Sequence, residues 1–81
     1  MNKHIELVKK YLADNDSVTL QELEANEDAA ADYDAWTDAA AYWAAYWAVE
    51  AAAYRGDDAD YVESCKKRAI EAIKEYEELT K

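Results

Sequence analysis

The chain has 81 residues, which suffices for one domain, and we expect a single helical domain over residues 1–81. Its 19 acidic residues outnumber its 9 basic ones, and the formal charge of −10 excludes binding to nucleic-acid phosphates. One Cys, one Gly and no Pro argue against a disulfide framework, a glycine-rich phosphate loop and a turn-rich β fold.

The first predicted element is a helix over residues 3–13. Apolar side chains recur there at helical spacing and form one stripe, made of Ile5, Val8, Tyr11 and Leu12. The polar residues 14–17 then end the helix, because short polar side chains compete for the hydrogen bonds of the backbone.

A second helix begins after Thr19, which forms a capping-box pattern with Glu22. The polar residues that follow allow a new helix to begin, with Asn26 as its N-cap. We therefore expect a short helix at 20–25 and a long helix at 28–54. A single helix that joins the two segments is the open alternative.

The long segment is rich in Ala, which makes up 13 of the 25 residues from 29 to 53. Two apolar stripes run along it at helical spacing. The first consists of Tyr33, Trp36, Ala40, Trp43, Trp47 and Tyr54. The second consists of Ala35, Ala39, Tyr42, Tyr46, Val49 and Ala53. A helix that is apolar nearly all round is central in its bundle or lies at a subunit interface. We expect Ala to permit close approach of the helices and the Trp side chains to fill the space between them.

The last predicted helix covers residues 58–79. Gly56 ends the preceding helix, and Asp57 or Asp58 caps the new one. Apolar residues, among them Cys65, repeat along it at nearly heptad spacing. The whole pattern predicts an all-α bundle of three to four helices around the long Ala-rich and aromatic helix.

The charge of the chain is unevenly distributed. Residues 14–60 hold 13 acids and one base, Arg55, and no Lys or Arg occurs from residue 11 to residue 54. Acids also stand four residues apart, as in Asp28 with Asp32 and Asp34 with Asp38, and each such pair destabilises a helix by about 0.2–0.5 kcal/mol. An ordinary soluble helix would place bases between them, so this clustering points to a role other than stability.

Acids four apart on a helix are separated by about 6 Å along its axis, which is similar to the spacing of phosphates along a DNA strand. Such a row offers a DNA-binding groove the charge pattern that it expects from DNA, and Lys or Arg pair with either anion. We therefore expect a DNA mimic that occupies the DNA-binding groove of a host protein. Its predicted contact residues are Glu22, Glu24, Glu27, Asp28, Asp32, Asp34, Asp38, Tyr42, Tyr46, Asp57, Asp58 and Asp60.

Other chemistry is weakly represented in the sequence. His4 and Cys65 are each the only residue of their type, so we expect no metal site, no cofactor and no catalytic set. The protein is accordingly predicted not to be an enzyme. The alternative to a DNA mimic is a structural or adaptor protein, whose aromatic helix oligomerises or docks a partner while the acids only keep it soluble.

The tract from Ala39 to Ala48 resembles a loose group of small acidic proteins, rich in Ala and aromatic residues, that tailed phages encode. The segments 16–18 and 76–80 are similar in character to the same group. The resemblance implies a phage setting, in which small acidic inhibitors of host nucleases, restriction enzymes, CRISPR effectors or uracil-DNA glycosylases are known. The longest uncharged run, Ala39–Val49, is too short to span a bilayer, and no signal peptide is recognisable, so we expect the host cytoplasm.

Overall fold

The computed structural model describes residues 2–32 and 36–81, and of Trp36 the backbone only. These residues form four α-helices and one 3₁₀ helix, which are α1 (Lys3–Ala13), η1 (Asn15–Ser17), α2 (Leu20–Ala30), α3 (Trp36–Ala53) and α4 (Ala59–Leu79). No strand occurs within the described ranges. The predicted all-α bundle is therefore confirmed.

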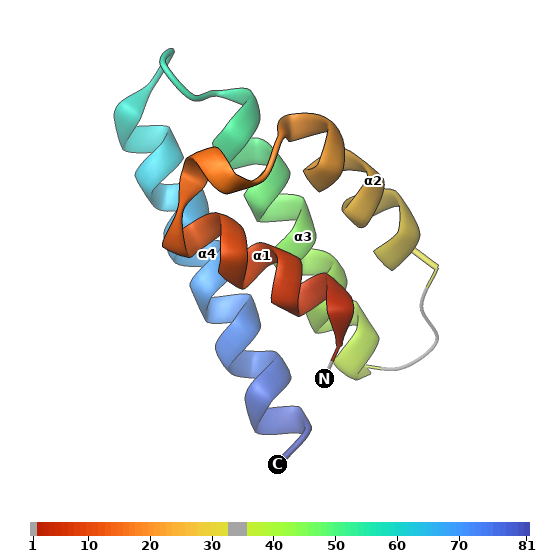
Figure 1. Cartoon of the computed structure of the whole chain (residues 1–81). Coiled ribbons are helices and arrows are strands. Elements are labelled where there is room, and N and C mark those ends of the chain that lie inside the picture. Colours follow the sequence, from red (N-terminus) through yellow and green to blue (C-terminus); the bar gives the residue numbers. More distant parts are fainter. Residues whose placement is uncertain (1, 33–35) are drawn as a thin grey trace.

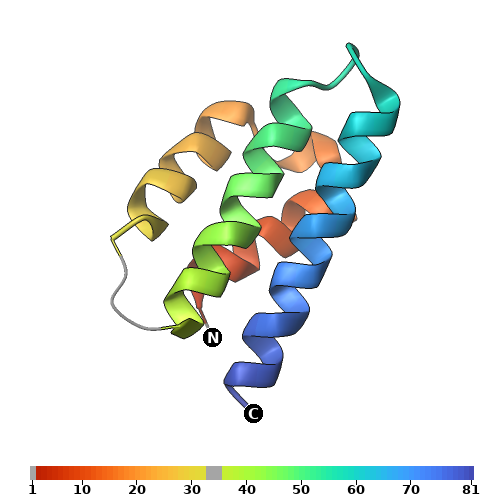
Figure 2. The ribbon, with the colours of Figure 1, turned by 180° about the vertical axis from the view of Figure 1, so that it is seen from behind.

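The helices are arranged as a layer of three with the fourth lying across it. Helices α2, α3 and α4 lie side by side, and α1 crosses one face of this layer (Figure 1). Seen from behind, α3 is in the middle and the opposite face of the layer has no helix over it (Figure 2). Helix α3 contacts each of the other three helices. The long Ala-rich segment thus supplies the central helix, as the sequence predicts.

The ends of the helices follow the capping signals of the sequence. The Thr19 hydroxyl accepts the backbone N–H of Glu22 at 3.1 Å, and the Glu22 carboxylate accepts the backbone N–H of Thr19 at 3.0 Å. This reciprocal pair is the predicted capping box. The Asp58 side chain caps α4, and Gly56, with φ +91°, adopts the left-handed conformation that the turn between α3 and α4 requires.

The prediction of a helix break near Asn26 is wrong, as is the prediction of one long helix over 28–54. Helix α2 runs without interruption past the predicted short helix at 20–25. Asn26 lies within α2, and its side chain is buried instead of capping a new helix. Its Oδ1 lies 2.7 Å from Nδ1 of His4, and its Nδ2 donates to the His4 carbonyl oxygen at 3.3 Å. These bonds satisfy a buried polar side chain across the α1–α2 contact.

Helix α2 ends after the acidic residues that were expected to continue it. Glu27 and Asp28 lie in its last turns, where the helix dipole disfavours negative charge, and α2 has no base in its last turn. The N–H of Ala31 closes the helix on the carbonyl oxygens of these two residues, at 3.0 and 3.3 Å. Because α2 ends here, the chain can turn and α2 can pack against α3, with Leu23 and Ala30 in the core. Burial of this apolar face outweighs the small gain from a longer helix.

The expectation that Trp side chains fill the space between the helices is wrong for Trp43, which is 47% exposed, whereas Trp47 is partly buried and packs against the core. The Trp36 side chain lies outside the described residues. The buried side of α3 is made almost entirely of Ala, and Ala44, Ala45, Ala48 and Ala51 have no exposed surface. Small side chains allow the three neighbouring helices to approach α3 closely, and a Trp at these positions would hold them apart. The larger core side chains come from the other helices, including Ile5, Val8, Tyr11, Leu23, Cys65 and Ile73.

Candidate partner-binding surface

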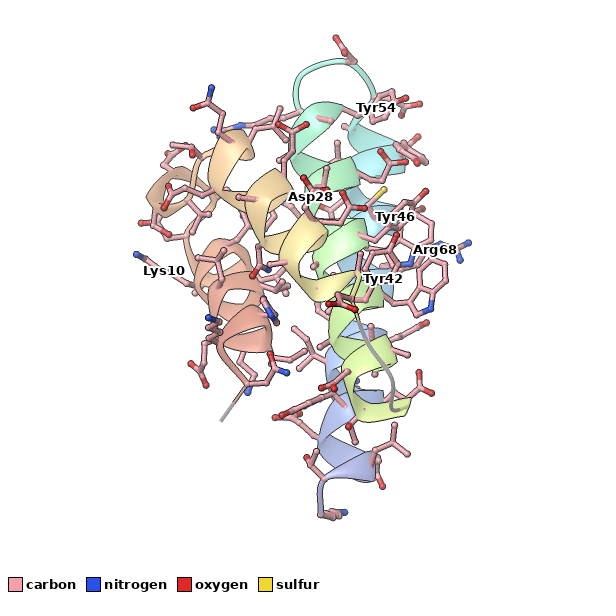
Figure 3. The ribbon with its side chains drawn as sticks, turned by 90° about the vertical axis from the view of Figure 1, so that its right-hand side faces the viewer. Lys10, Asp28, Tyr42, Tyr46, Tyr54 and Arg68 are labelled. Atoms are coloured by element: carbon pink, nitrogen blue, oxygen red, sulfur yellow. The ribbon has the colours of Figure 1, made fainter. Side chains whose placement is uncertain are left out.

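Four of the predicted contact residues form a row that we name the acidic ridge, made of Glu24, Glu27, Asp28 and Asp32. Three of them lie on α2 and the fourth lies in the bend after it. Glu24, Asp28 and Asp32 are exposed, whereas Glu27 is partly buried on the α3 side. In Figure 3, Asp28 lies on the α2–α3 side of the molecule and Lys10 of α1 points away from it.

Burial is the main cause that raises the pKa of the Glu27 carboxyl above its ordinary value, and the negative charges of Asp28 and Glu50 raise it further. The contributions of these neighbouring carboxylates, which come from α2 and α3, indicate a local negative potential between the two helices. The potential would attract a positively charged group of another molecule.

Two predicted contact residues instead stabilise helix ends. Glu22 belongs to the capping box, and bonds with Thr19 lower the pKa of its carboxyl. The charge of Lys10 lowers it a little further, which places Glu22 towards α1 and away from the acidic ridge. The Asp58 carboxylate accepts the backbone N–H of Tyr61 at 3.1 Å. Their carboxylates are therefore held by the fold itself.

The remaining predicted acids lie at separate places. Asp57 and Asp60 flank the cap of α4, beside the turn between α3 and α4, and both are exposed. Asp38 is exposed in the first turn of α3. Asp34 lies outside the described residues. The expectation of one straight row of acids along a single helix is wrong, because Glu27 and Asp28 lie on α2 and Asp38 lies on α3.

Within the described ranges, three salt bridges occur, and none involves a predicted contact acid. Lys9 pairs with Glu77 at 3.1 Å and Lys81 with Glu78 at 3.7 Å. Arg55, the only base between residues 14 and 60, pairs with Asp16 at 2.9 Å. Among residues 2–32 and 36–81, no base forms a salt bridge with a carboxylate of the acidic ridge.

Tyr46 connects the acidic ridge to a small polar network on α3 and α4. The Glu50 carboxylate accepts the hydroxyl of Tyr46 at 3.4 Å and that of Tyr61 at 3.2 Å through the same oxygen. The charge of Glu50 is the main cause that raises the pKa of Tyr46, and the charge of Glu27 contributes. Burial raises the pKa of Tyr61, as does its hydrogen bonding to Cys65 and Glu50. Both phenols therefore stay protonated and can donate at neutral pH.

The Cys65 thiol lies under this network and has no exposed surface. Burial is the main cause that raises its pKa, so the thiol stays protonated and unreactive. The sequence places Cys65 on the apolar stripe of the last helix, and the structure confirms that it belongs to the core.

The outer side of α3 carries four large rings in contact with one another, which we name the aromatic stripe: Tyr42, Trp43, Tyr46 and Trp47. Trp43 is 47% exposed, and Tyr54, which follows α3 and is not part of the stripe, is 44% exposed. Neighbouring rings meet edge to face, with centroid distances of 5.4 Å from Trp43 to Tyr42 and 5.5 Å from Trp43 to Tyr46. The Arg68 guanidinium of α4 lies over the Trp47 ring, 4.9 Å from its centre.

The acidic ridge and the aromatic stripe lie next to each other. Tyr42 and Tyr46 are on the side of α3 towards which Asp28 lies, and Arg68 marks the α4 side of the stripe (Figure 3). The predicted contact residues Tyr42 and Tyr46 are thus brought together with the α2 acids. Asp57, Asp58 and Asp60 are not, since they lie by the turn at the other end of α3.

No family model, curated protein or solved structure matches this chain. No helix among the described residues is long and apolar enough to cross a membrane. Residues 2–32 and 36–81 also contain no group of three or more His, Cys, Asp or Glu side chains that could hold a metal ion.

The predicted contact residues of the DNA mimic do not include Trp43, Trp47, Glu50, Tyr61 and Arg68, although the adaptor alternative uses the aromatic helix as a docking surface. The signal that could have located them is the run of Ala at residues 41, 44, 45, 48 and 51, which marks a continuous face at helical spacing. When a helix has one face of small residues and one of large rings, close packing with several neighbours favours the small face. The rings then face outward.

Proposed function

We propose that the protein binds in the DNA-binding groove of another protein and keeps DNA out of it. The observation that carries this proposal is the unpaired state of the acidic ridge. Glu24 and Asp28 stand four residues apart on the exposed side of α2, and Asp32 follows after four more. No base of the described residues neutralises them. A basic groove would supply the missing counter-charges.

The spacing of these acids supports the same proposal. Residues four apart in α2 are separated by about 6 Å along the axis, a distance similar to that between phosphates of one DNA strand. The like charges of Glu24 and Asp28 cost α2 about 0.2–0.5 kcal/mol. A base between them would remove this cost, and the chain has none there. The resemblance to phage-encoded proteins favours a host nuclease, restriction enzyme, CRISPR effector or uracil-DNA glycosylase as the target.

The experiment has two stages. The protein is immobilised, bacterial proteins that bind at low salt are eluted with high salt, and each is then purified. Competition between this protein and duplex DNA for the purified partner is measured over a range of salt concentrations. We expect mutual exclusion and an affinity that falls steeply with salt. A partner that binds duplex DNA and this protein at the same time would refute the proposal.

A charge-matched pair of variants tests the position of the acids. The double variant Glu24→Gln with Asp28→Asn removes two charges from the acidic ridge. The control, Glu6→Gln with Glu63→Gln, removes two charges from exposed positions on α1 and α4. We expect the first variant to lose inhibition of DNA binding and the control to retain it. Equal losses would mean that only the net charge matters, which contradicts a specific acidic ridge.

The exposed aromatic stripe favours a second candidate, an adaptor that docks a partner or a second copy through α3. Large exposed apolar patches with polar rims mark interaction sites in soluble proteins. In this case binding depends on Trp43 and changes little with salt. Sedimentation equilibrium and a salt series on the captured partner separate the two candidates.

A further inference from the structure

The structure leaves one face of its three-helix layer uncovered, and the aromatic stripe lies on that face (Figures 2 and 3). Helix α1 covers only the other face. The Trp43 side chain is 47% exposed, although burial of a Trp side chain removes a large apolar area from water and is strongly favourable. A docking face with an aromatic centre and a charged rim has the composition of a protein–protein interface.

The rings of the aromatic stripe are held in place before any partner arrives. Trp43 meets Tyr42 at 64° and Tyr46 at 79° between ring planes, and Tyr46 meets Trp47 at 82°. Rings that brace one another lose little conformational entropy when they bind. The stripe is therefore a preorganised surface.

Arg68 shows which chemistry this surface accepts. Its guanidinium carbon lies 4.9 Å from the centre of the Trp47 ring, within the range of a cation–π contact. Among the described residues, this is the only cation over an aromatic ring. Trp43 stands one turn before Trp47 on the same helix and receives no cation from this part of the chain.

A carboxylate lies close to the same rings. The Glu50 carboxylate accepts the hydroxyl of Tyr46 at 3.4 Å, and the Tyr46 ring is 5.5 Å from that of Trp43. A guanidinium over Trp43 would therefore stand in a negative potential. Its flat shape fits both an indole face and a carboxylate, whereas the compact ammonium of Lys stacks poorly.

We propose that Trp43, together with the carboxylate of Glu50, receives an arginine side chain of the partner, which stacks on the indole as Arg68 does on Trp47. This inference rests on the proposed function, because the DNA-binding groove of the partner supplies the arginine. DNA-binding proteins use arginine widely to contact phosphates and guanine. Trp43 becomes the centre of the interface and the acidic ridge becomes its rim.

The test compares two capped peptides of equal charge, one with three arginines separated by glycines and one with lysines in their place. Each is titrated into the ¹⁵N-labelled protein at low salt, and the indole N–H signals report binding. We expect the arginine peptide to bind at least five times more tightly. In Trp43→Ala this preference falls below twofold, whereas Tyr54→Ala, which removes the exposed ring that follows α3 and meets Tyr61, keeps it. Trp43→Phe retains a smaller ring and an intermediate preference, and circular dichroism checks that each variant is folded.

The outcomes separate the two proposals. Equal, salt-sensitive binding of both peptides would overturn the arginine site and leave the docking of a basic groove intact. If neither peptide binds in a salt-dependent way, both proposals fall. A dimer in sedimentation equilibrium that Trp43→Ala dissociates would show that a second copy covers the aromatic stripe, and it would also overturn the arginine site.

Discussion

The substitution Ala48→Leu tests the packing of α3 most directly, because Ala48 has no exposed surface. A Leu there adds three carbon atoms to a core that is packed around small side chains. Overpacking of this kind costs about 1–3 kcal/mol. For a domain of this size each kcal/mol lowers Tm by about 4–8 °C, so we expect a fall of about 4–24 °C.

Thermal and urea denaturation, followed by circular dichroism at 222 nm, measure this effect. The matched control is Ala53→Leu, at the exposed end of the same helix. Leu and Ala have similar helix propensities, so the control should lie within about 0.5 kcal/mol of the parent. If Ala48→Leu is as stable as Ala53→Leu, α3 does not pack through its Ala face. The outward position of the aromatic stripe would then be wrong.

Two further predictions concern single contacts. Thr19→Ala removes the capping box and should cost about 0.5–2 kcal/mol in urea denaturation, whereas Glu22→Gln keeps both bonds and should cost less. Tyr61 has a pKa raised above its ordinary value of 10.0, so its contribution to stability is complete below pH 10 and is lost as the pH rises through its folded-state pKa. Tyr61→Phe should therefore lose less stability between pH 9 and 11, and an unchanged alkaline slope would contradict the assignment.

Both ends of α1 and the starts of α2 and α4 were predictable because their signals are local. Side chains that bond to the backbone within a few positions define the helix at residues 3–13, the capping box at Thr19 and the cap at Asp58. The apolar stripe of α1 has one face only, so its burial was also predictable. Such features need no knowledge of the rest of the fold.

The orientation of α3 and the break before it were not predictable by the same reasoning. Between Ala39 and Val49 the segment is apolar on every side, so periodicity does not say which side is buried. The choice depends on three neighbouring helices that approach at once. The break depends on whether α2 gains more from lying against α3 than from continuing, which is a tertiary effect. Asn26 was misread because its partner, His4, is 22 residues away.

These two errors change the meaning of the acidic residues. If the aromatic side of α3 were buried in the bundle, the acids of residues 22–38 would form a charged surface with no exposed aromatic rings beside it. In the structure the acidic ridge lies beside an exposed aromatic stripe, where a chain of net charge −10 also gains solubility from repulsion between molecules. Solubility through repulsion depends only on the net charge, so acids on α1 would serve it equally well. Residues 1–13 nevertheless carry three bases and one acid. The concentration of acids on α2 beside the stripe, with the bases of α1 on the other face, is what the proposed basic partner surface would require.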